Sequence, residues 1–444
     1  MIAKYYQLLK EFIEIQSISN DKEHSWDIKK VAKRLKKIFE EHKMDVKIIE
    51  WYWNPIIIAD YEHNKNLPTC TIYWNYDVLT ANKKYWRKED PFSLYIWKEN
   101  IYGRWVADTK WQLLIHIVSI FELIKEKNLW YNIRFFIEWE KIVWSENTKR
   151  FIIENQEKLK SDFFVISDWS LTNNNKWSIW VSTRWNIDIS LIIKTANNQI
   201  NVWTYWGIVP NAIHETCKLL SKLHWGNNQI NIPYFYYDVV EIPFNTILSN
   251  KKIEFETEKI QKELLVKSIF KEKNLDYISQ IWLRPTVQII SIKSWYDNKT
   301  TRITIQNKVI VNINFKTVKK QSSDKIIKSF QQWINSNIPD YVEHDIKINQ
   351  ISEWTEIDTK NKYFLKAKSF LQDIFQNEVI DLNLGTNIPI LNTITNNITD
   401  NILLIPMANN NCNSQWSSEN LNIKLIEKWF LFALNFFSTQ LQLF

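Results

Sequence analysis

Five short segments of the chain carry polar side chains that could bind a cation or move a proton. They are residues 68–78 (PTCTIYWNYDV), 102–112 (YGRWVADTKWQ), 134–145 (RFFIEWEKIVWS), 162–168 (DFFVISD) and 411–419 (NCNSQWSSE). Asp77, Asp108 and Asp168 supply carboxylates, whose oxygens are ligands of divalent cations. Lys141 supplies a positive charge in the third segment. Converging carboxylates without a cation raise one another's pKa, so a lysine between two of them would take the role of a metal ion.

Strands and helices that alternate along the chain must position these segments. Apolar residues at helical spacing predict helices over residues 3–15, 26–43, 108–127 and 361–375. Short runs rich in Ile, Val and Tyr predict strands over residues 46–50, 56–61, 70–74, 133–137 and 163–166. This alternation predicts an α/β layer with a largely parallel sheet and a site at the strand ends.

The pattern changes after Arg184. Residues 186–194 alternate between apolar and polar, and a Lys/Glu-rich stretch occupies 250–275. The remaining predicted elements are a helix near 210–224, strands at 286–292, 301–305 and 308–315, a helix at 323–335 and a strand at 344–350. We expect a separate α+β module inserted into the first domain. The predicted division is 1–183 for the first part of the α/β domain, 184–355 for the inserted module and 356–444 for the second part.

In order, the five segments resemble the motifs of the di-zinc exopeptidase and aminoacylase family. This family includes carnosinase-type dipeptidases, succinyl-diaminopimelate desuccinylase and acetylornithine deacetylase. The resemblance spans nearly the whole chain, and the Arg284-Pro285-Thr286 segment places it nearest the dipeptidase-like branch. It implies a zinc-exopeptidase-like α/β domain with a mixed central sheet, interrupted by an inserted α+β, ferredoxin-like lid or dimerisation domain. It also implies a homodimer.

The resemblance implies a site with two Zn²⁺ ions about 3.5–4 Å apart, which polarise an amide carbonyl and generate hydroxide. Two metal ligands are retained, Asp108 at the bridging position and Asp168 as the second aspartate. Asp77, which in the family orients the first histidine ligand, and Glu419 are also retained.

Other family positions are substituted. Asn75 stands for the first histidine ligand, Ile142 for the glutamate ligand and Gln415 for the last histidine. Lys141 stands at the position of the general-base glutamate. Asn201 stands for the histidine that reaches a neighbouring subunit's active site, and Asn383 for the arginine that clamps a substrate carboxylate.

These substitutions weaken the implied metal site. Zinc is expected for the family, but amide oxygens are weak zinc ligands and Ile142 is none, so we expect zinc to be absent or weakly bound here. Mg²⁺ or Ca²⁺ could still bind loosely. We expect Lys141 to form an ion pair with Asp108 or Asp168 in place of the lost metal. The alternative for Lys141 is a solvated lysine at the end of a strand. The alternative for Asp108 and Asp168 is that they act only as helix-cap and strand-end residues.

Glycine is nearly missing from the chain, whereas tryptophan is abundant. The 4 glycines and 24 tryptophans together make 28 of 444 residues, close to the roughly 7% of glycine in an average protein. Several tryptophans stand in turn-like contexts, where glycine is favoured. They are Trp53 before Asn54-Pro55, Trp105 after Gly103-Arg104, Trp144 before Ser145 and Trp206 beside Gly207. Some bacterial lineages read UGA as glycine, and we hypothesise that most of these tryptophans are glycine codons read with the wrong code.

The bulk properties are those of an ordinary globular protein. The length of 444 residues predicts two or three domains. The net charge of +7 is spread along the chain without a basic block, which argues against nucleic-acid and membrane-surface binding. Cys70, Cys217 and Cys412 match no metal or redox spacing, and reduced thiols are expected of a cytoplasmic protein. The chain shows no signal-peptide core and no apolar run of ~20 residues.

Two functions remain open from the sequence. The first is a catalytically impaired relative of the dipeptidases that binds peptides or amino acids, or acts as a partner of an active paralogue. The second is an active metal-dependent hydrolase with an altered metal site, cleaving a dipeptide or an N-acyl amino acid. The loss of three of five metal ligands and of the general base favours the first.

Overall fold

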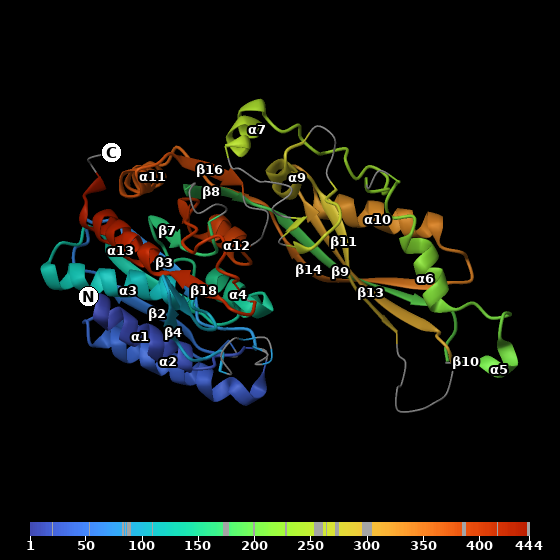
Figure 1. The fold of residues 1–444 in the computed structure, drawn as a ribbon, viewed down its shortest axis with the longest axis horizontal. Coiled ribbons are helices and arrows are strands. Elements are labelled where there is room, and N and C mark those ends of the chain that lie inside the picture. Colours follow the sequence, from blue (N-terminus) through green and yellow to red (C-terminus); the bar gives the residue numbers. More distant parts are fainter. Residues whose placement is uncertain are drawn as a thin grey trace. The chain divides into compact units, whose positions relative to one another are not determined.

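The protein forms two compact units, shown as a ribbon in Figure 1. The computed structural model describes residues 1–19, 21–52, 54–81, 84, 86, 90–108, 110–171, 177–198, 200–226, 229–252, 261–262, 264–270, 275–294, 304–383, 388–414 and 416–441. Unit 1 comprises residues 1–182, 355–383 and 388–444, and unit 2 comprises residues 183–354. Trp53 and Gln415, which the sequence analysis singled out, lie outside the described residues.

A mixed sheet forms the centre of unit 1. In the described part of the chain its path runs β1 (Asp45–Ile49), β2 (Ile56–Tyr61), β6 (Asn132–Glu138), β3 (Thr69–Asn75), β7 (Phe163–Ile166), β17 (Ile402–Leu404), β8 (Trp177–Thr183) and β15 (Thr355–Glu356), and β16 (Val379–Asn383) pairs with β8. The central strands β6, β3, β7 and β17 are parallel. The pairs β1–β2, β2–β6 and β17–β8 are antiparallel. Because β16 pairs with β8 in parallel, the expectation of a largely parallel sheet is right for the centre and for this pair, and wrong for β1, β2 and the β17–β8 pair.

Helices cover this sheet. They are α1 (Ile2–Glu14), α2 (Ser25–Glu40), α3 (Lys110–Glu126), α4 (Glu146–Glu154), α11 (Lys362–Phe375), α12 (Leu391–Asn397) and α13 (Ile423–Ser438). Helix α3 packs against α1, α13 and β3, which buries it on nearly all sides. Helix α2 packs on β1 and β2 with an apolar stripe. A small separate sheet joins β4 (Tyr95–Trp97), β5 (Asn100–Tyr102) and β18 (Asn420–Asn422).

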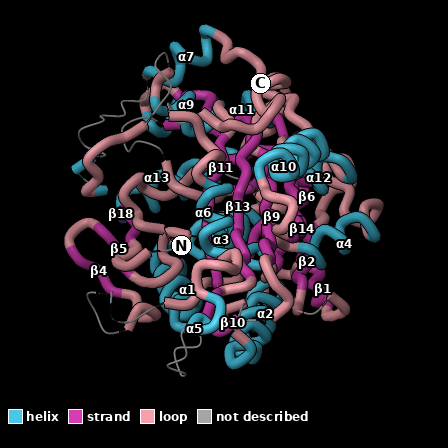
Figure 2. The backbone as a smooth tube through the Cα atoms, turned by 90° about the vertical axis from the view of Figure 1, so that its right-hand side faces the viewer, coloured by secondary structure: helices cyan, strands magenta, loops and turns pink. Residues whose placement is uncertain are grey.

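Unit 2 is an α+β module. Its antiparallel sheet has the order β11 (Thr286–Ser294), β13 (Lys308–Thr317), β9 (Trp185–Lys194) and β14 (Glu343–Ser352), side by side in Figure 2. Alternate residues of β9, from Ile187 to Ile193, are buried in a core with α6 (Ala212–Leu220) and α10 (Ser323–Asn337). The period of two in the sequence reflects this one-sided burial. Residues 286–294 and 304–315 thus lie outside the main sheet, as predicted.

Shorter elements complete unit 2. Strand β10 (Ile200–Asn201) pairs with β12 (Thr304–Ile305), and the remaining helices are α5 (Val202–Tyr205), α7 (Phe244–Lys251) and α9 (Tyr277–Leu283). The helix predicted near 210–224 is α6, which ends earlier, at Leu220, where the chain turns. Among the described residues, no helix is both long and apolar enough to cross a membrane.

Candidate functional site

Three segments of the predicted site follow neighbouring strands of unit 1. Asp77 lies two residues after β3 and Asp168 two residues after β7, and these strands are parallel neighbours. The 3₁₀ turn Lys141–Val143 follows β6, which pairs in parallel with β3 on the other side. The carboxyl ends of parallel strands meet at one sheet edge, so the topology brings these segments together. Asp108 approaches from the loop between β5 and α3.

Lys141 and Asp168 form a buried ion pair. The Lys141 Nζ donates a hydrogen bond to Asp168 Oδ2, and the two side chains are only 10% and 6% exposed. The backbone N–H of Trp169 donates to Asp168 Oδ1 at 2.7 Å. Burial opposes the charge of Lys141, but the carboxylates of Asp168 and Asp108 outweigh it and raise the Lys141 pKa above its ordinary value. The ion pair expected from the sequence is present, and its partner is Asp168.

Glu419 holds the loop that carries Asp108. Its Oε1 accepts hydrogen bonds from the backbone N–H groups of Ala107 at 2.8 Å and Asp108 at 3.0 Å. Arg104 Nη1 lies 3.6 Å from the other carboxylate oxygen. Burial, followed by the charge of Asp108, raises the pKa of Glu419 to about 7. Glu419 therefore positions Asp108 through the backbone.

Asn75 and Ile142, at two predicted metal-ligand positions, both donate hydrogen bonds to the Asp77 carboxylate. Asn75 Nδ2 donates to Asp77 Oδ1 at 2.9 Å, and the backbone N–H of Ile142 donates to Asp77 Oδ2 at 2.9 Å. Burial, followed by the charge of Glu138, raises the pKa of Asp77 to about 7. The Ile142 side chain packs against an apolar cluster that contains Val78. It belongs to the core and offers no ligand atom.

Two glutamates of the third segment were missed as site residues. Glu138 is fully buried and accepts hydrogen bonds from Tyr73, from Ser145 Oγ at 2.7 Å and from Thr148 Oγ1 at 2.6 Å. Glu140 accepts the backbone N–H of Asn147 at 2.9 Å, in the first turn of α4, where the helix dipole favours a negative charge. Their alternate spacing just before Lys141 was the available signal. Both carboxylates hold the segment that follows the Lys141–Val143 turn, at Ser145 and in the first turn of α4.

The donor set does not fit a zinc pair. In the part of the chain that the structure describes, no group of three or more His, Cys, Asp and Glu side chains gathers as a metal site. The Asn75 amide donates its hydrogen bond to Asp77, and the Lys141 ammonium forms an ion pair with the Asp168 carboxylate. These two side chains are therefore bound to protein partners. Gln415 lies outside the described residues.

The two predicted substrate-binding positions have local structural roles. Asn383 ends β16, and its Oδ1 accepts a hydrogen bond from Ser182 Oγ at 2.6 Å. Asn201, in unit 2, caps α5 by accepting the backbone N–H of Trp203 at 2.9 Å. Their part in substrate binding stays a prediction.

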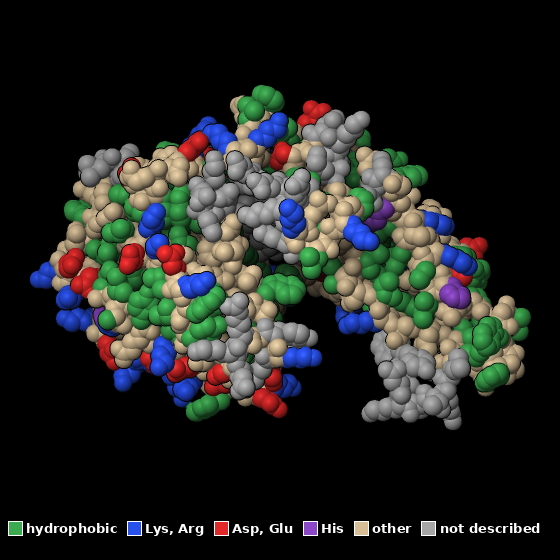
Figure 3. Space-filling model, in the orientation of Figure 1, with side chains coloured by type: hydrophobic (Ala, Val, Ile, Leu, Met, Phe, Trp, Pro, Cys, Tyr) green, Lys and Arg blue, Asp and Glu red, His purple; other side chains and the backbone are tan. Residues whose placement is uncertain are grey.

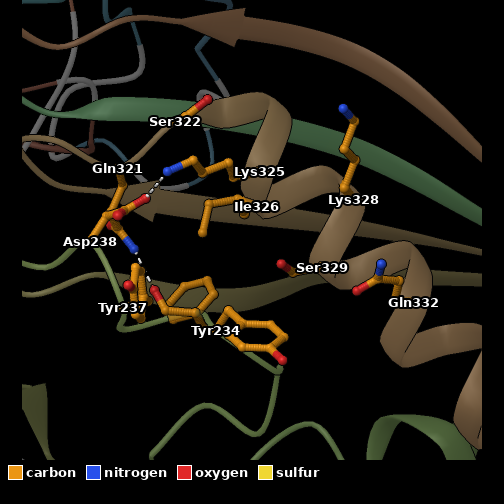
Figure 4. Close-up of a pocket in the computed structure, with 11 residues that line it drawn as sticks. Tyr234, Tyr237, Asp238, Gln321, Ser322, Lys325, Ile326, Lys328, Ser329 and Gln332 are labelled. Carbon is orange, nitrogen blue, oxygen red and sulfur yellow. Dashed lines mark hydrogen bonds and ion pairs between the residues drawn. The ribbon is translucent and has the colours of Figure 1, made fainter.

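Unit 2 has a separate cavity of about 360 Å³ between residues 234–238 and helix α10 (Figure 4). Tyr234 and Tyr237 line one side, and Lys325 of α10 forms an ion pair with Asp238 at 2.8 Å. Both side chains of this pair are partly exposed, whereas those of Lys141 and Asp168 in unit 1 are buried. On the face drawn in Figure 3, basic and acidic side chains are interspersed.

The chain is similar to several dipeptidases. Residues 198–342 match the peptidase dimerisation domain. The human Beta-Ala-His dipeptidase is 24% identical over 367 residues, which cover 80% of this chain and 71% of that protein. The Candida albicans Cys-Gly metallodipeptidase DUG1 is 23% identical over 394 residues, which cover 83% and 78%.

Solved structures share the fold over nearly the full length. Human carnosine dipeptidase 1 superimposes with a TM-score of 0.84 at 20% identity, covering 98% of this chain and 96% of that one. The M20 family metallo-carboxypeptidase Sso-CP2 from Sulfolobus solfataricus gives 0.86 at 19% identity, covering 98% of both chains. Residues 198–342 therefore contain a peptidase dimerisation domain, and the chain has the fold of the M20 family structures, an α/β domain interrupted by an inserted α+β module.

Proposed function

We propose that this protein keeps the dipeptidase fold but has lost metal-dependent hydrolysis, and that it binds small peptides or N-acyl amino acids. The ion pair between Lys141 and Asp168 is the observation that supports this above all. The names of the relatives, Beta-Ala-His dipeptidase and Cys-Gly metallodipeptidase, support small peptides as the ligand class.

The positive charge of Lys141 opposes both metal binding at Asp168 and general-base catalysis at position 141. A cation that bound Asp168 would have to displace the ammonium and leave it buried without a partner, which is strongly unfavourable. A general base must be able to accept a proton near neutral pH. Lys141 cannot do so while its pKa lies above the ordinary lysine value.

The second candidate is an active hydrolase with an altered or single metal ion. The retained carboxylates Asp108 and Asp168 favour it, since both lie within the electrostatic reach of Lys141 and could bind a hard cation if the lysine moved. Metal-dependent turnover would distinguish this enzyme from a peptide-binding protein.

We further propose a homodimer formed through unit 2, because residues 198–342 match a peptidase dimerisation domain. A cytoplasmic location is proposed because Cys70, Cys217 and Cys412 are all free thiols. Sedimentation at micromolar concentration tests the dimer, and a monomer there would contradict it.

The central experiment combines metal analysis with activity. Protein purified in the presence of zinc is analysed for bound metal, for hydrolysis of β-Ala-His and Cys-Gly, and for its Tm with and without a chelator. We expect substoichiometric zinc, no hydrolysis and an unchanged Tm, while a bound dipeptide raises the Tm by mass action. Stoichiometric zinc with hydrolysis that is lost on chelation would overturn the proposal.

A gain-of-function variant provides the matched control. Asn75→His, Lys141→Glu, Ile142→Glu and Gln415→His together restore the family's ligand and base residues. We expect this variant to bind zinc stoichiometrically, because two imidazoles and a carboxylate replace two amides and an alkyl group. If the original chain binds zinc as tightly as this variant, Lys141 does not block the site.

A further inference from the structure

Three tryptophans adopt the left-handed backbone conformation that favours glycine. They are Trp105, Trp144 and Trp169, with φ angles of 70°, 80° and 61°. For a residue with a side chain this region costs roughly 1–2 kcal/mol, and for a bulky residue it is an outlier. The three lie close in sequence to the candidate site, since Trp105 is three residues before Asp108, Trp144 three residues after Lys141, and Trp169 directly after Asp168.

We propose that positions 105, 144 and 169 are glycine in the protein as its native host makes it. The codon behind these residues is then UGA, read as glycine. Composition supports this independently of the backbone, because only 4 glycines stand against 24 tryptophans in 444 residues. An average protein has roughly 7% glycine.

The surroundings of the side chain point the same way for Trp144, whereas Trp105 is buried, so the argument for position 105 rests on its backbone and on composition. Trp144 combines a φ of 80° with an indole that is 42% exposed. Elsewhere the indoles of Trp51 and Trp203 are 93% and 81% exposed, although tryptophan is highly buried on average. A side chain that buries as little area as that of Trp144 does not repay the conformational strain of its backbone.

Trp429 shows the opposite environment. It lies inside helix α13, is 1% exposed, and its indole N–H donates to the carbonyl of Met407 at 2.8 Å. Glycine there would open a cavity and weaken the helix. Trp429, buried and in a helix, is therefore a control for Trp144, whose side chain is exposed and whose φ is positive.

Glycine at position 169 changes the candidate site itself. The Lys141 ammonium lies 4.6 Å from the centre of the Trp169 ring. Without that ring, the ion pair with Asp168 would lose one aromatic wall and become more accessible to a ligand. The identity of residue 169 is independent of whether the protein hydrolyses peptides, so the two proposals fail separately.

Mass spectrometry of the protein from its native host tests the inference directly. The tryptic peptides 105–110, 142–149 and 161–176 each contain one of the three positions. We expect each peptide mass to contain glycine in place of tryptophan. A tryptophan mass in these peptides would overturn the inference.

A stability series tests the backbone argument in recombinant protein. Trp144→Gly should raise the Tm by roughly 2–4 °C, whereas Trp144→Ala should not, because alanine keeps the Cβ that opposes a positive φ. Trp429→Gly should lower the Tm. Equal Tm values for the glycine and alanine variants at 144 would show that the backbone there does not require glycine.

Discussion

Two buried lysines of unit 1, Lys141 and Lys366, meet opposite electrostatic surroundings. Lys366 is fully buried, and its Nζ donates to the Tyr131 hydroxyl at 2.6 Å and to the carbonyls of Phe436 at 2.7 Å and Thr439 at 2.6 Å. With only neutral partners, burial lowers the pKa of Lys366 to about 7. The pKa of Lys141 is instead raised by carboxylates.

Aromatic contacts do not explain this difference, because both lysines have them. Lys366 Nζ lies 4.7 Å from the ring centres of Tyr131 and Phe436, and Lys141 Nζ lies 4.6 Å from that of Trp169. The carboxylates of Asp168 and Asp108 distinguish the two sites. A buried ammonium thus keeps its charge where carboxylates lie close to it, and loses that charge more readily where all its partners are neutral.

The largest expected effect is that of Lys141→Met. Removal of the ammonium leaves the Asp168 carboxylate buried without its cation, which should lower the free energy of unfolding by about 3 kcal/mol at neutral pH. The loss should shrink in acid, because protonation then neutralises the carboxylate. Urea denaturation measures it, and Lys141→Met combined with Asp168→Leu should recover much of the loss. Wild-type stability of the single variant would show that the pair is not a structural replacement for a metal.

Lys366 should show the next largest effect, as a dependence on pH. Its folded pKa of about 7 lies below the ordinary value of 10.5, so between these values the unfolded chain binds more protons than the folded one. Stability from this group therefore rises with pH in that window, by up to ~1.4 kcal/mol per pH unit. From pH 7 to pH 9 we expect the wild type to gain about 2 kcal/mol relative to Lys366→Met. A parallel pH dependence of the two proteins would contradict the comparison of the two lysines.

A smaller effect is expected at Glu419, a buried carboxylate whose Oε2 lies 3.6 Å from Arg104 Nη1. Its folded pKa of about 7 exceeds the ordinary value of 4.5, so the folded state binds more protons between these values. Stability from this group is fully present below pH 4.5 and is lost as the pH rises through 7. Between pH 5 and pH 6, Glu419→Gln should remove about 1 kcal/mol of this decline. Unfolding free energies at the two pH values measure the change, and an identical decline in both proteins would assign it to other carboxylates.

The helices and strands that the sequence predicted correctly are those with a clear local spacing of apolar residues. Helices α1 and α2 each bury one apolar stripe and were found within a few residues. Helix α13 was missed, although its buried residues Ile426, Trp429, Ala433 and Phe436 follow helical spacing. The parallel strand β17 has only three residues, and such a short apolar run does not reveal its structure.

Some features of the candidate site were also predictable from the sequence, and others were not. The ion pair of Lys141 was predictable because a lysine beside carboxylates has few alternatives, but the sequence left the choice between Asp108 and Asp168 open. The roles of Glu138 and Glu140 were not, because their partners include Tyr73 on another strand and the first turn of α4. Those contacts exist only after the chain folds, and residue type and spacing alone do not specify them.

The smallest expected effect belongs to an exposed counterpart of the buried pair. Lys325 and Asp238 lie 2.8 Å apart in unit 2, but their side chains are 67% and 25% exposed. Water already solvates both charges, so Lys325→Met should change the free energy of unfolding by at most ~0.5 kcal/mol. Added salt should reduce even that change, whereas the effect of Lys141→Met should persist because buried charges are poorly screened. The same urea titrations at low and high salt provide the measurement. Equal losses for the two lysine variants would mean that burial does not set the strength of the Lys141 pair.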